Sequence, residues 1–91
     1  MADTFALYRE AVAAYDAACA AERAAKLAHY TDESATEVRP EATKETLEAY
    51  YAARRATAPL WRAREAAQKA HTESLKAANR RGAKQERDNA R

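Results

Sequence analysis

The sequence predicts an all-α protein built as a long antiparallel helical hairpin. One glycine and two prolines are all that interrupt 91 residues, and alanine alone supplies 27 of them. Alanine is the strongest helix former, whereas turn-dense β classes need many more glycines and prolines. In addition, alanine recurs at helical spacing in both halves of the chain, which indicates two helices that pack closely together.

Large aliphatic side chains are scarce. Leu, Val and Phe together number eight, and isoleucine is absent, so the chain cannot build a large conventional core. No apolar run is long enough for a transmembrane span or a signal peptide. The single cysteine cannot form an internal disulfide, which fits a reducing compartment. We therefore expect a cytoplasmic protein, and the composition leaves open a chain that folds only on its partner.

The expected elements follow from their capping residues. Asp3 is a typical N-cap for a first helix over residues 3–30. Residues 31–39 are rich in Ser, Thr and acids and predict a loop. Pro40 suits the first position of a second helix over residues 40–81, and Gly82 suits its left-handed C-terminal end. Residues 1–82 thus form one helical domain, and the polar, basic tail 83–91 is expected to be disordered.

Pro59 is the one obstacle within the second helix. Proline removes a backbone hydrogen bond and clashes with the preceding turn. No Gly, Asn, Asp or Ser flanks it, and the alanine pattern keeps its phase through it. These features favour a kinked continuous helix, with a break and a three-helix bundle as the alternative.

Steps of four and three residues select an uncharged seam on each helix. The first consists of Leu7, Ala11, Ala14, Ala18, Ala21, Ala25 and Ala28, and the second of Ala42, Thr46, Ala49, Ala53, Ala56, Leu60, Ala63, Ala67, Ala70, Ser74 and Ala77. An average step of 3.5 residues is the period of a coiled coil, and alanine lets helix backbones approach closely. The seams therefore predict the hairpin contact.

Most large side chains fall beside these seams. The aromatic candidates for self-association or partner binding are Phe5, Tyr8, Tyr15, Tyr50, Tyr51 and Trp61. Two helices cannot bury both the seams and these side chains, so we expect a second copy or another protein to cover them. A dimeric helical bundle is the simplest closed arrangement, and a single hairpin or three-helix bundle with the aromatics inside is the alternative.

Charge is divided unevenly along the chain. Residues 1–53 carry ten acids and five bases, whereas residues 54–91 carry four acids and eleven bases. The bases of the predicted second helix include a stripe of Arg55, Arg62, Lys69, Lys76, Arg80 and Arg81. Such a stripe is compatible with a solvated face, with docking to a protein or a second copy, or with nucleic-acid phosphates.

Catalysis finds almost no support in the sequence. His29 and His71 have no Cys or His at metal-ligand spacing, and His29 with Glu33 is a common helix-surface pair. Cys19 follows the aromatic stripe and is expected to be a small buried apolar residue, not a nucleophile. We expect no enzyme, no metal and no cofactor.

The sequence thus predicts a non-catalytic helical protein that acts through protein–protein interaction as an adaptor, assembly factor or inhibitor. Its homodimer is the expected form, without a membrane or a small-molecule substrate. The alanine and arginine usage is typical of small bacterial or phage accessory proteins. The alternative is a nucleic-acid-binding accessory protein that uses the basic C-terminal half.

Overall fold

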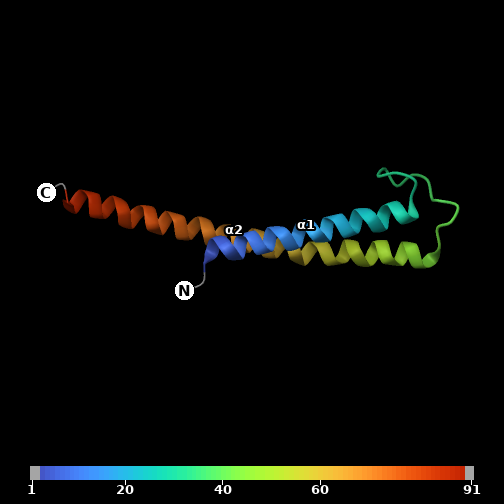
Figure 1. Cartoon of the computed structure of the whole chain (residues 1–91), viewed down its shortest axis with the longest axis horizontal. Coiled ribbons are helices and arrows are strands. Elements are labelled where there is room, and N and C mark those ends of the chain that lie inside the picture. Colours follow the sequence, from blue (N-terminus) through green and yellow to red (C-terminus); the bar gives the residue numbers. More distant parts are fainter. Residues whose placement is uncertain (1–2, 90–91) are drawn as a thin grey trace.

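Two antiparallel helices make up the fold. The computed structural model describes residues 3–89 and contains helix α1 (Thr4–His29) and helix α2 (Lys44–Asn89). The helices lie side by side and form an elongated hairpin of 76 × 24 × 14 Å (Figure 1). The predicted all-α hairpin is confirmed.

Helix α1 begins at the cap that the sequence indicated. The Asp3 carboxylate accepts hydrogen bonds from the backbone N–H groups of Phe5 and Ala6, at 3.0 and 3.3 Å. At the other end, Tyr30 turns to an extended conformation while its N–H still donates to the Lys26 carbonyl. The helix lies within one residue of the expected range 3–30.

The loop between the helices folds back on the end of α1. Tyr30 and Val38 form an isolated antiparallel bridge, and the Arg39 N–H donates to the His29 carbonyl at 2.8 Å. The Arg39 side chain donates from Nε to the Leu27 carbonyl at 2.6 Å. Arg39 therefore satisfies carbonyl groups in the last turn of α1, as basic side chains commonly do at helix C-termini.

Helix α2 begins later than expected, at Lys44 instead of near Pro40. Thr43 is its cap, because the Thr43 hydroxyl accepts from the Thr46 N–H and the Thr46 hydroxyl accepts from the Thr43 N–H. This reciprocal pair is a capping box with Thr in place of the usual Glu. Pro40 instead lies in a turn in which the Ala42 N–H donates to the Arg39 carbonyl. The side-chain cap outweighs the preference of proline for a first helical position.

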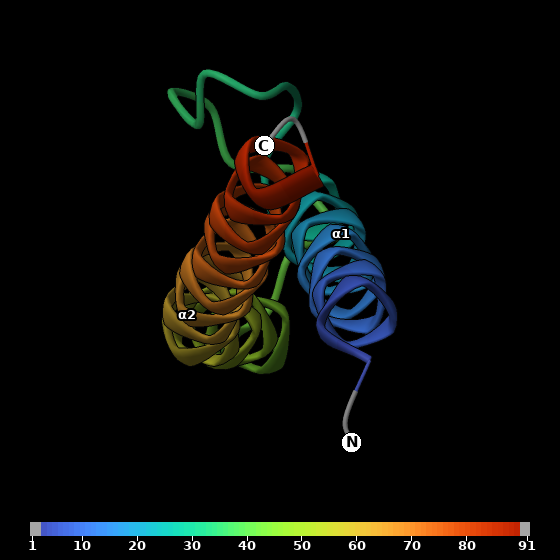
Figure 2. The same ribbon diagram turned by 90° about the vertical axis from the view of Figure 1, so that its left-hand side faces the viewer.

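Helix α2 is continuous through Pro59, as expected. The alternative, a break that gives a three-helix bundle, is not formed. Pro59 and Arg55, whose carbonyl loses its usual donor, are both exposed, so water can replace that hydrogen bond. Viewed nearly along its length, α2 bows (Figure 2). The Thr57 hydroxyl also donates to the Ala53 carbonyl at 3.0 Å, a bond that commonly accompanies helix bending.

The expected end of the second helix at residue 81 is wrong. The helix runs through Gly82 to Asn89, and Gly82 does not adopt a positive φ. A glycine inside a helix costs only about 1 kcal/mol, and Ala83, Lys84, Gln85 and Glu86 are good helix formers. Within the described range, the tail expected to be disordered is therefore helical; residues 90 and 91 lie outside it.

The last part of α2 extends beyond its partner helix. Thr4, the first residue of α1, bonds His71, so residues 72–89 continue past the hairpin (Figure 1). We call these residues the extension. At 1.5 Å per residue its 18 residues are about 27 Å long.

Heptad positions explain why less than half of each predicted seam lies in the hairpin contact. The interface positions of α1 recur in steps of four and three from Thr4 to His29, and those of α2 recur likewise from Thr46 to His71. They are Thr4, Tyr8, Ala11, Tyr15, Ala18, Glu22, Ala25 and His29 against Thr46, Tyr50, Ala53, Thr57, Leu60, Arg64, Ala67 and His71, all of them half-buried or buried.

Apart from the half-buried Ala42 and Ala77 and the exposed Ser74 of the second predicted seam, the remaining seam residues occupy a neighbouring heptad position and are exposed. The seam prediction was therefore wrong for Leu7, Ala14, Ala21 and Ala28 on α1 and for Ala49, Ala56, Ala63 and Ala70 on α2. Larger side chains take the places that these alanines were expected to fill: Tyr8, Tyr15, Glu22 and His29 on α1, and Tyr50, Thr57, Arg64 and His71 on α2. They fill the space between the two helices better than alanines do. The contact is still thin: among the described residues only Tyr50 and His29 are buried.

Candidate interaction surfaces

The two long sides of the hairpin differ in side-chain size. In an antiparallel pair of helices, residues at the same heptad position beside the interface lie on the same side of the pair, whichever helix they belong to. One side therefore carries the exposed column Leu7, Ala14, Ala21, Ala28, Ala49, Ala56, Ala63 and Ala70, which we call the alanine face. The other side carries Phe5, Val12, Cys19, Lys26, Leu47, Arg54, Trp61, Gln68 and Leu75, which we call the aromatic face.

The six aromatic candidates divide into two groups. Tyr8 and Tyr15 are half-buried and Tyr50 is buried, so the hairpin itself covers them. Phe5, Tyr51 and Trp61 remain exposed, with 50, 43 and 39% of their surface accessible. Phe5 and Trp61 belong to the aromatic face, whereas Tyr51 lies elsewhere on α2. Sequence analysis could not separate the groups because it took the seams as the whole interface.

Trp61 is held in a cluster that crosses from one helix to the other. Its ring centre lies 5.2 Å from that of Tyr15 on α1. The Arg64 guanidinium lies 5.1 Å from the Trp61 ring and 5.8 Å from the Tyr15 ring. Arg64 is itself half-buried, so its cation–π contacts stabilise the cluster more than they would on an open surface. The contacts with Tyr15 and Arg64 thus hold the Trp61 side chain in place while part of its surface stays exposed.

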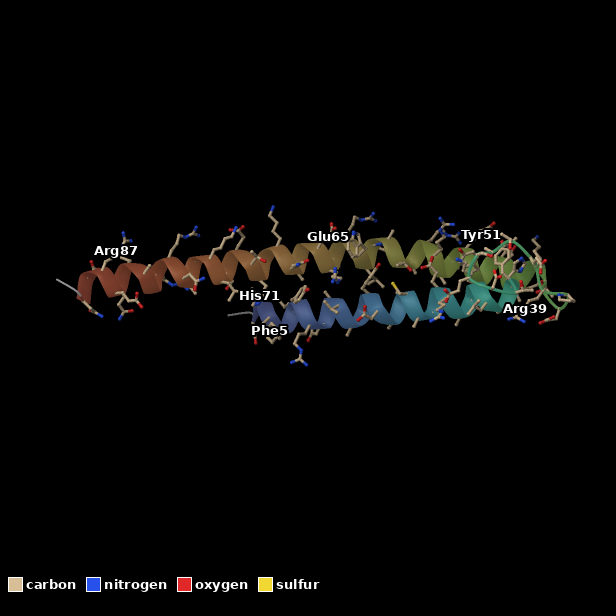
Figure 3. The ribbon with its side chains drawn as sticks, turned by 90° about the horizontal axis from the view of Figure 1, so that it is seen from above. Phe5, Arg39, Tyr51, Glu65, His71 and Arg87 are labelled. Atoms are coloured by element: carbon tan, nitrogen blue, oxygen red, sulfur yellow. The ribbon has the colours of Figure 1, made fainter. Side chains whose placement is uncertain are left out.

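A second aromatic cluster closes the open end of the hairpin. The His71 ring lies 5.4 Å from the Phe5 ring and 6.3 Å from the Tyr8 ring (Figure 3). The Thr4 hydroxyl lies 3.1 Å from His71 Nδ1. This cluster brings exposed Phe5 to the same side as Leu75, four residues beyond His71.

Polar side chains within the hairpin contact are the part that sequence analysis missed. His29 was expected on the surface beside Glu33; instead it is buried, its Nδ1 lies 2.7 Å from the Thr46 hydroxyl, and Glu33 pairs with Arg23. Because the Thr46 hydroxyl donates to the Thr43 carbonyl, His29 Nδ1 must donate to Thr46.

Thr57 makes a further polar contact between the helices. Its hydroxyl lies 3.5 Å from the Glu22 carboxylate. Polar residues at seven-residue spacing could have predicted such contacts: Glu22 and His29 on α1, and Thr57, Arg64 and His71 on α2.

Two titratable groups are shifted by local hydrogen bonds. The pKa of Tyr15 is raised above its ordinary value, chiefly by a hydrogen bond with the Cys19 side chain. The pKa of Asp32 in the loop is lowered, chiefly because its carboxylate accepts a hydrogen bond from the Ser34 hydroxyl. Tyr15 is half-buried in the hairpin contact, whereas Asp32 is exposed in the loop.

No metal centre is formed by the residues from 3 to 89, where no group of three or more His, Cys, Asp or Glu could hold an ion. Cys19 is half-buried and free. Neither helix, over its described length, has a segment both long and apolar enough to cross a bilayer.

The basic stripe lies on α2 and is longer than expected. Arg55, Arg62, Lys69, Lys76 and Arg80 are all exposed. Arg81 is rotated by about 100° from Arg80 and leaves the stripe. Because the helix continues, Lys84 and Arg87 join it instead. The stripe is separate from both the aromatic face and the alanine face.

The chain matches no family model, and no curated protein or solved structure matches it. Function must therefore be argued from these surfaces alone.

Proposed function

We propose that this protein is a non-catalytic binding protein that acts through protein–protein contact, and that a second copy of the chain covers the aromatic face. The observation that carries the proposal is the exposure of Phe5, Trp61 and Leu75 together on one side of the hairpin. Trp and large apolar side chains that neighbouring residues hold in place are common anchors of protein interfaces.

The total exposed area supports this proposal. The chain exposes 6971 Å², whereas a compact monomer of 10.1 kDa exposes about 5,300 Å². A standard interface removes about 800 Å² from each partner. One interface on each chain therefore covers about half of the excess, and the aromatic face is the surface whose burial is most favourable per unit area.

A two-fold arrangement fits the spacing of the anchors. Trp61 and Leu75 are 14 residues apart, about 21 Å along α2, and Gln68 lies midway between them. A two-fold axis near Gln68 sets Trp61 of one copy beside Phe5 and Leu75 of the other, and the same contact then occurs twice. In this form the protein is a four-helix assembly whose outer faces remain free to act as an adaptor, assembly factor or inhibitor.

Light scattering coupled to size exclusion tests the proposal. We expect a mass near twice 10.1 kDa for the native chain. Trp61→Glu should give a monomer, because it places a carboxylate against Phe5 and Leu75 of the other copy, where the charge would be desolvated without a partner.

Ala63→Glu is the matched control, since it adds the same charge two residues away on the alanine face and should leave the dimer intact. A native monomer at all concentrations would contradict the proposal. So would a dimer that Ala63→Glu disrupts and Trp61→Glu leaves intact.

A further inference from the structure

A long row of bases occupies the side of α2 that faces away from α1. Arg55, Arg62, Lys69 and Lys76 are seven residues apart, or about two helical turns, on the heptad position opposite the interface. Steps of four, four and three residues then continue the same side of the helix along the extension. The complete basic row is Arg55, Arg62, Lys69, Lys76, Arg80, Lys84 and Arg87, all exposed.

The charge of the basic row is largely uncompensated. The acids along the same stretch of α2 are Glu65, Glu73, Glu86 and Asp88, and Lys76 pairs with Glu73 at 4.0 Å. Among residues 3–89, none of the other six bases has a carboxylate within 4.0 Å. Residues 55–88 carry nine bases and these four acids, a net charge of +5. From Arg55 to Arg87, the basic row is about 48 Å long.

The positions between the bases argue against a protein or a membrane as the occupant. They hold small or polar residues and no large apolar or aromatic side chain: Ala58, Pro59, Glu65, Ala66, Thr72 and Glu73. A protein partner needs a large apolar or aromatic anchor, and an interfacial membrane helix needs a continuous apolar side. The basic row has neither, so its attraction is purely electrostatic and suits a polyanion of regular charge spacing.

The shape of the extension favours duplex DNA among polyanions. In residues 72–89, α2 has no neighbouring helix (Figure 1). A single helix is about 10–12 Å across and fits the major groove of B-form DNA, about 12 Å wide, whereas the major groove of an RNA duplex is too narrow. Glu65 and Arg87 both lie on the side of α2 away from α1 (Figure 3). Arg62 and Lys69, three residues before and four residues after Glu65, lie on the same side by helical spacing, so bases of the hairpin can reach phosphates beside those met by the extension.

Single strands are a poorer fit. Proteins that hold single-stranded nucleic acid stack its bases on aromatic side chains, and none lies within the basic row between Arg55 and Arg87. We propose that the basic row binds the phosphate backbone of duplex DNA, with the extension seated in the major groove. Since phosphate contacts carry no base information, this binding is largely independent of sequence.

Fluorescence anisotropy with a labelled 30-base-pair duplex tests the proposal on the full-length native chain. Seven phosphate contacts predict a loss of affinity of about 10³- to 10⁴-fold between 50 and 200 mM salt. The triple variant Arg62→Gln, Lys69→Gln, Arg80→Gln should bind on the order of 10²-fold more weakly at 0.1 M salt, and its slope of log affinity against log salt should fall by about 2.7.

The matched control is Arg9→Gln, Arg23→Gln, Lys44→Gln, which loses the same three charges away from both the basic row and the aromatic face. It should retain nearly all of the affinity if the row is the binding surface. Far-UV circular dichroism on both variants checks that they remain helical. The single strand of the same sequence and poly-glutamate serve as competitors, and both should compete poorly against the duplex.

Three results would overturn the proposal: no duplex binding by the native chain at 50 mM salt, an equal loss in both triple variants, or tighter binding of the single strand or poly-glutamate. The proposed dimer lays Leu75 of the extension beside Trp61 of the other copy, so duplex binding is also measured on Trp61→Glu. That variant keeps every base of the basic row and should bind the duplex at least as well as the native chain, whether or not the native chain is a dimer.

Discussion

The two parts of helix α2 are covalently continuous but stabilised differently. Residues 44–71 pack on α1 through half-buried positions that recur every three or four residues, and they include the buried Tyr50. In the extension, Ala77 alone among the described residues is even half-buried. Contacts with α1 stabilise the packed part, whereas the extension is stabilised mainly by the helix propensity of its own residues.

This difference teaches where substitutions matter. Isolated helices of fewer than about 12–15 residues are marginal in water, and the 18-residue extension is only slightly longer. The extension stays helical because it continues directly from the packed part. No new helical turn has to be nucleated, so the free-energy cost of nucleation does not arise again. Changes in the packed part should therefore alter global stability, while changes in the extension should alter only local helicity.

Tyr50→Ala should have the largest effect. Tyr50 is 8% exposed, and its ring contacts Tyr30 across the end of the hairpin. Its loss should lower the free energy of unfolding by about 3 kcal/mol. Thermal unfolding followed by circular dichroism measures this change. Gln85→Ala in the extension is the control, and an equal loss there would remove the distinction between the two parts.

Ala53→Leu should have the next largest effect. Ala53 is half-buried in the interface, so the larger side chain must push the helices apart, at about 2 kcal/mol. Ala63→Leu changes an exposed alanine and should shift stability by less than about 0.5 kcal/mol. Urea titrations of both variants compare them, and equal midpoints would show that the assignment of the two heptad columns is mistaken.

Thr46→Val should cost about 1.5 kcal/mol. The substitution keeps the side-chain shape but leaves the buried His29 Nδ1 without its acceptor and removes part of the helix cap. Thr72→Val in the extension is the matched control and should be nearly neutral. Calorimetric unfolding of the two proteins decides the point, and a neutral Thr46→Val would refute the structural role of the His29 contact.

Gly82→Ala should have the smallest effect on the fold. A Cβ atom at Gly82 meets nothing within 4 Å, so the methyl group fits. It should stabilise the extension locally by about 1 kcal/mol and leave the unfolding midpoint of the hairpin unchanged. Amide hydrogen exchange should slow around residue 82. A raised midpoint would mean that the two parts unfold together.

The sequence was sufficient for the helices but not for their contact. Asp3, the loop composition and the scarcity of glycine predicted α1 and the hairpin. The alanines could not show which of two neighbouring heptad columns faces the other helix. Ala18 and Ala21 have the same side chain, and only the packing of larger residues such as Tyr15 distinguishes them. Among the candidate site residues, the spacing of the basic stripe was predictable, but its length depended on whether Gly82 ends the helix.

The polar contacts inside the hairpin have a consequence for the alignment of the two helices. An interface of alanines alone would allow one helix to slip past the other by seven residues with little change in energy. Such a slip would move Thr46 away from His29, Thr57 away from Glu22 and His71 away from Thr4, leaving groups in the interface without partners. These three pairs select a single register. The register fixes which residue of α2 lies beside the start of α1. These three pairs therefore also determine how much of α2 projects beyond the hairpin.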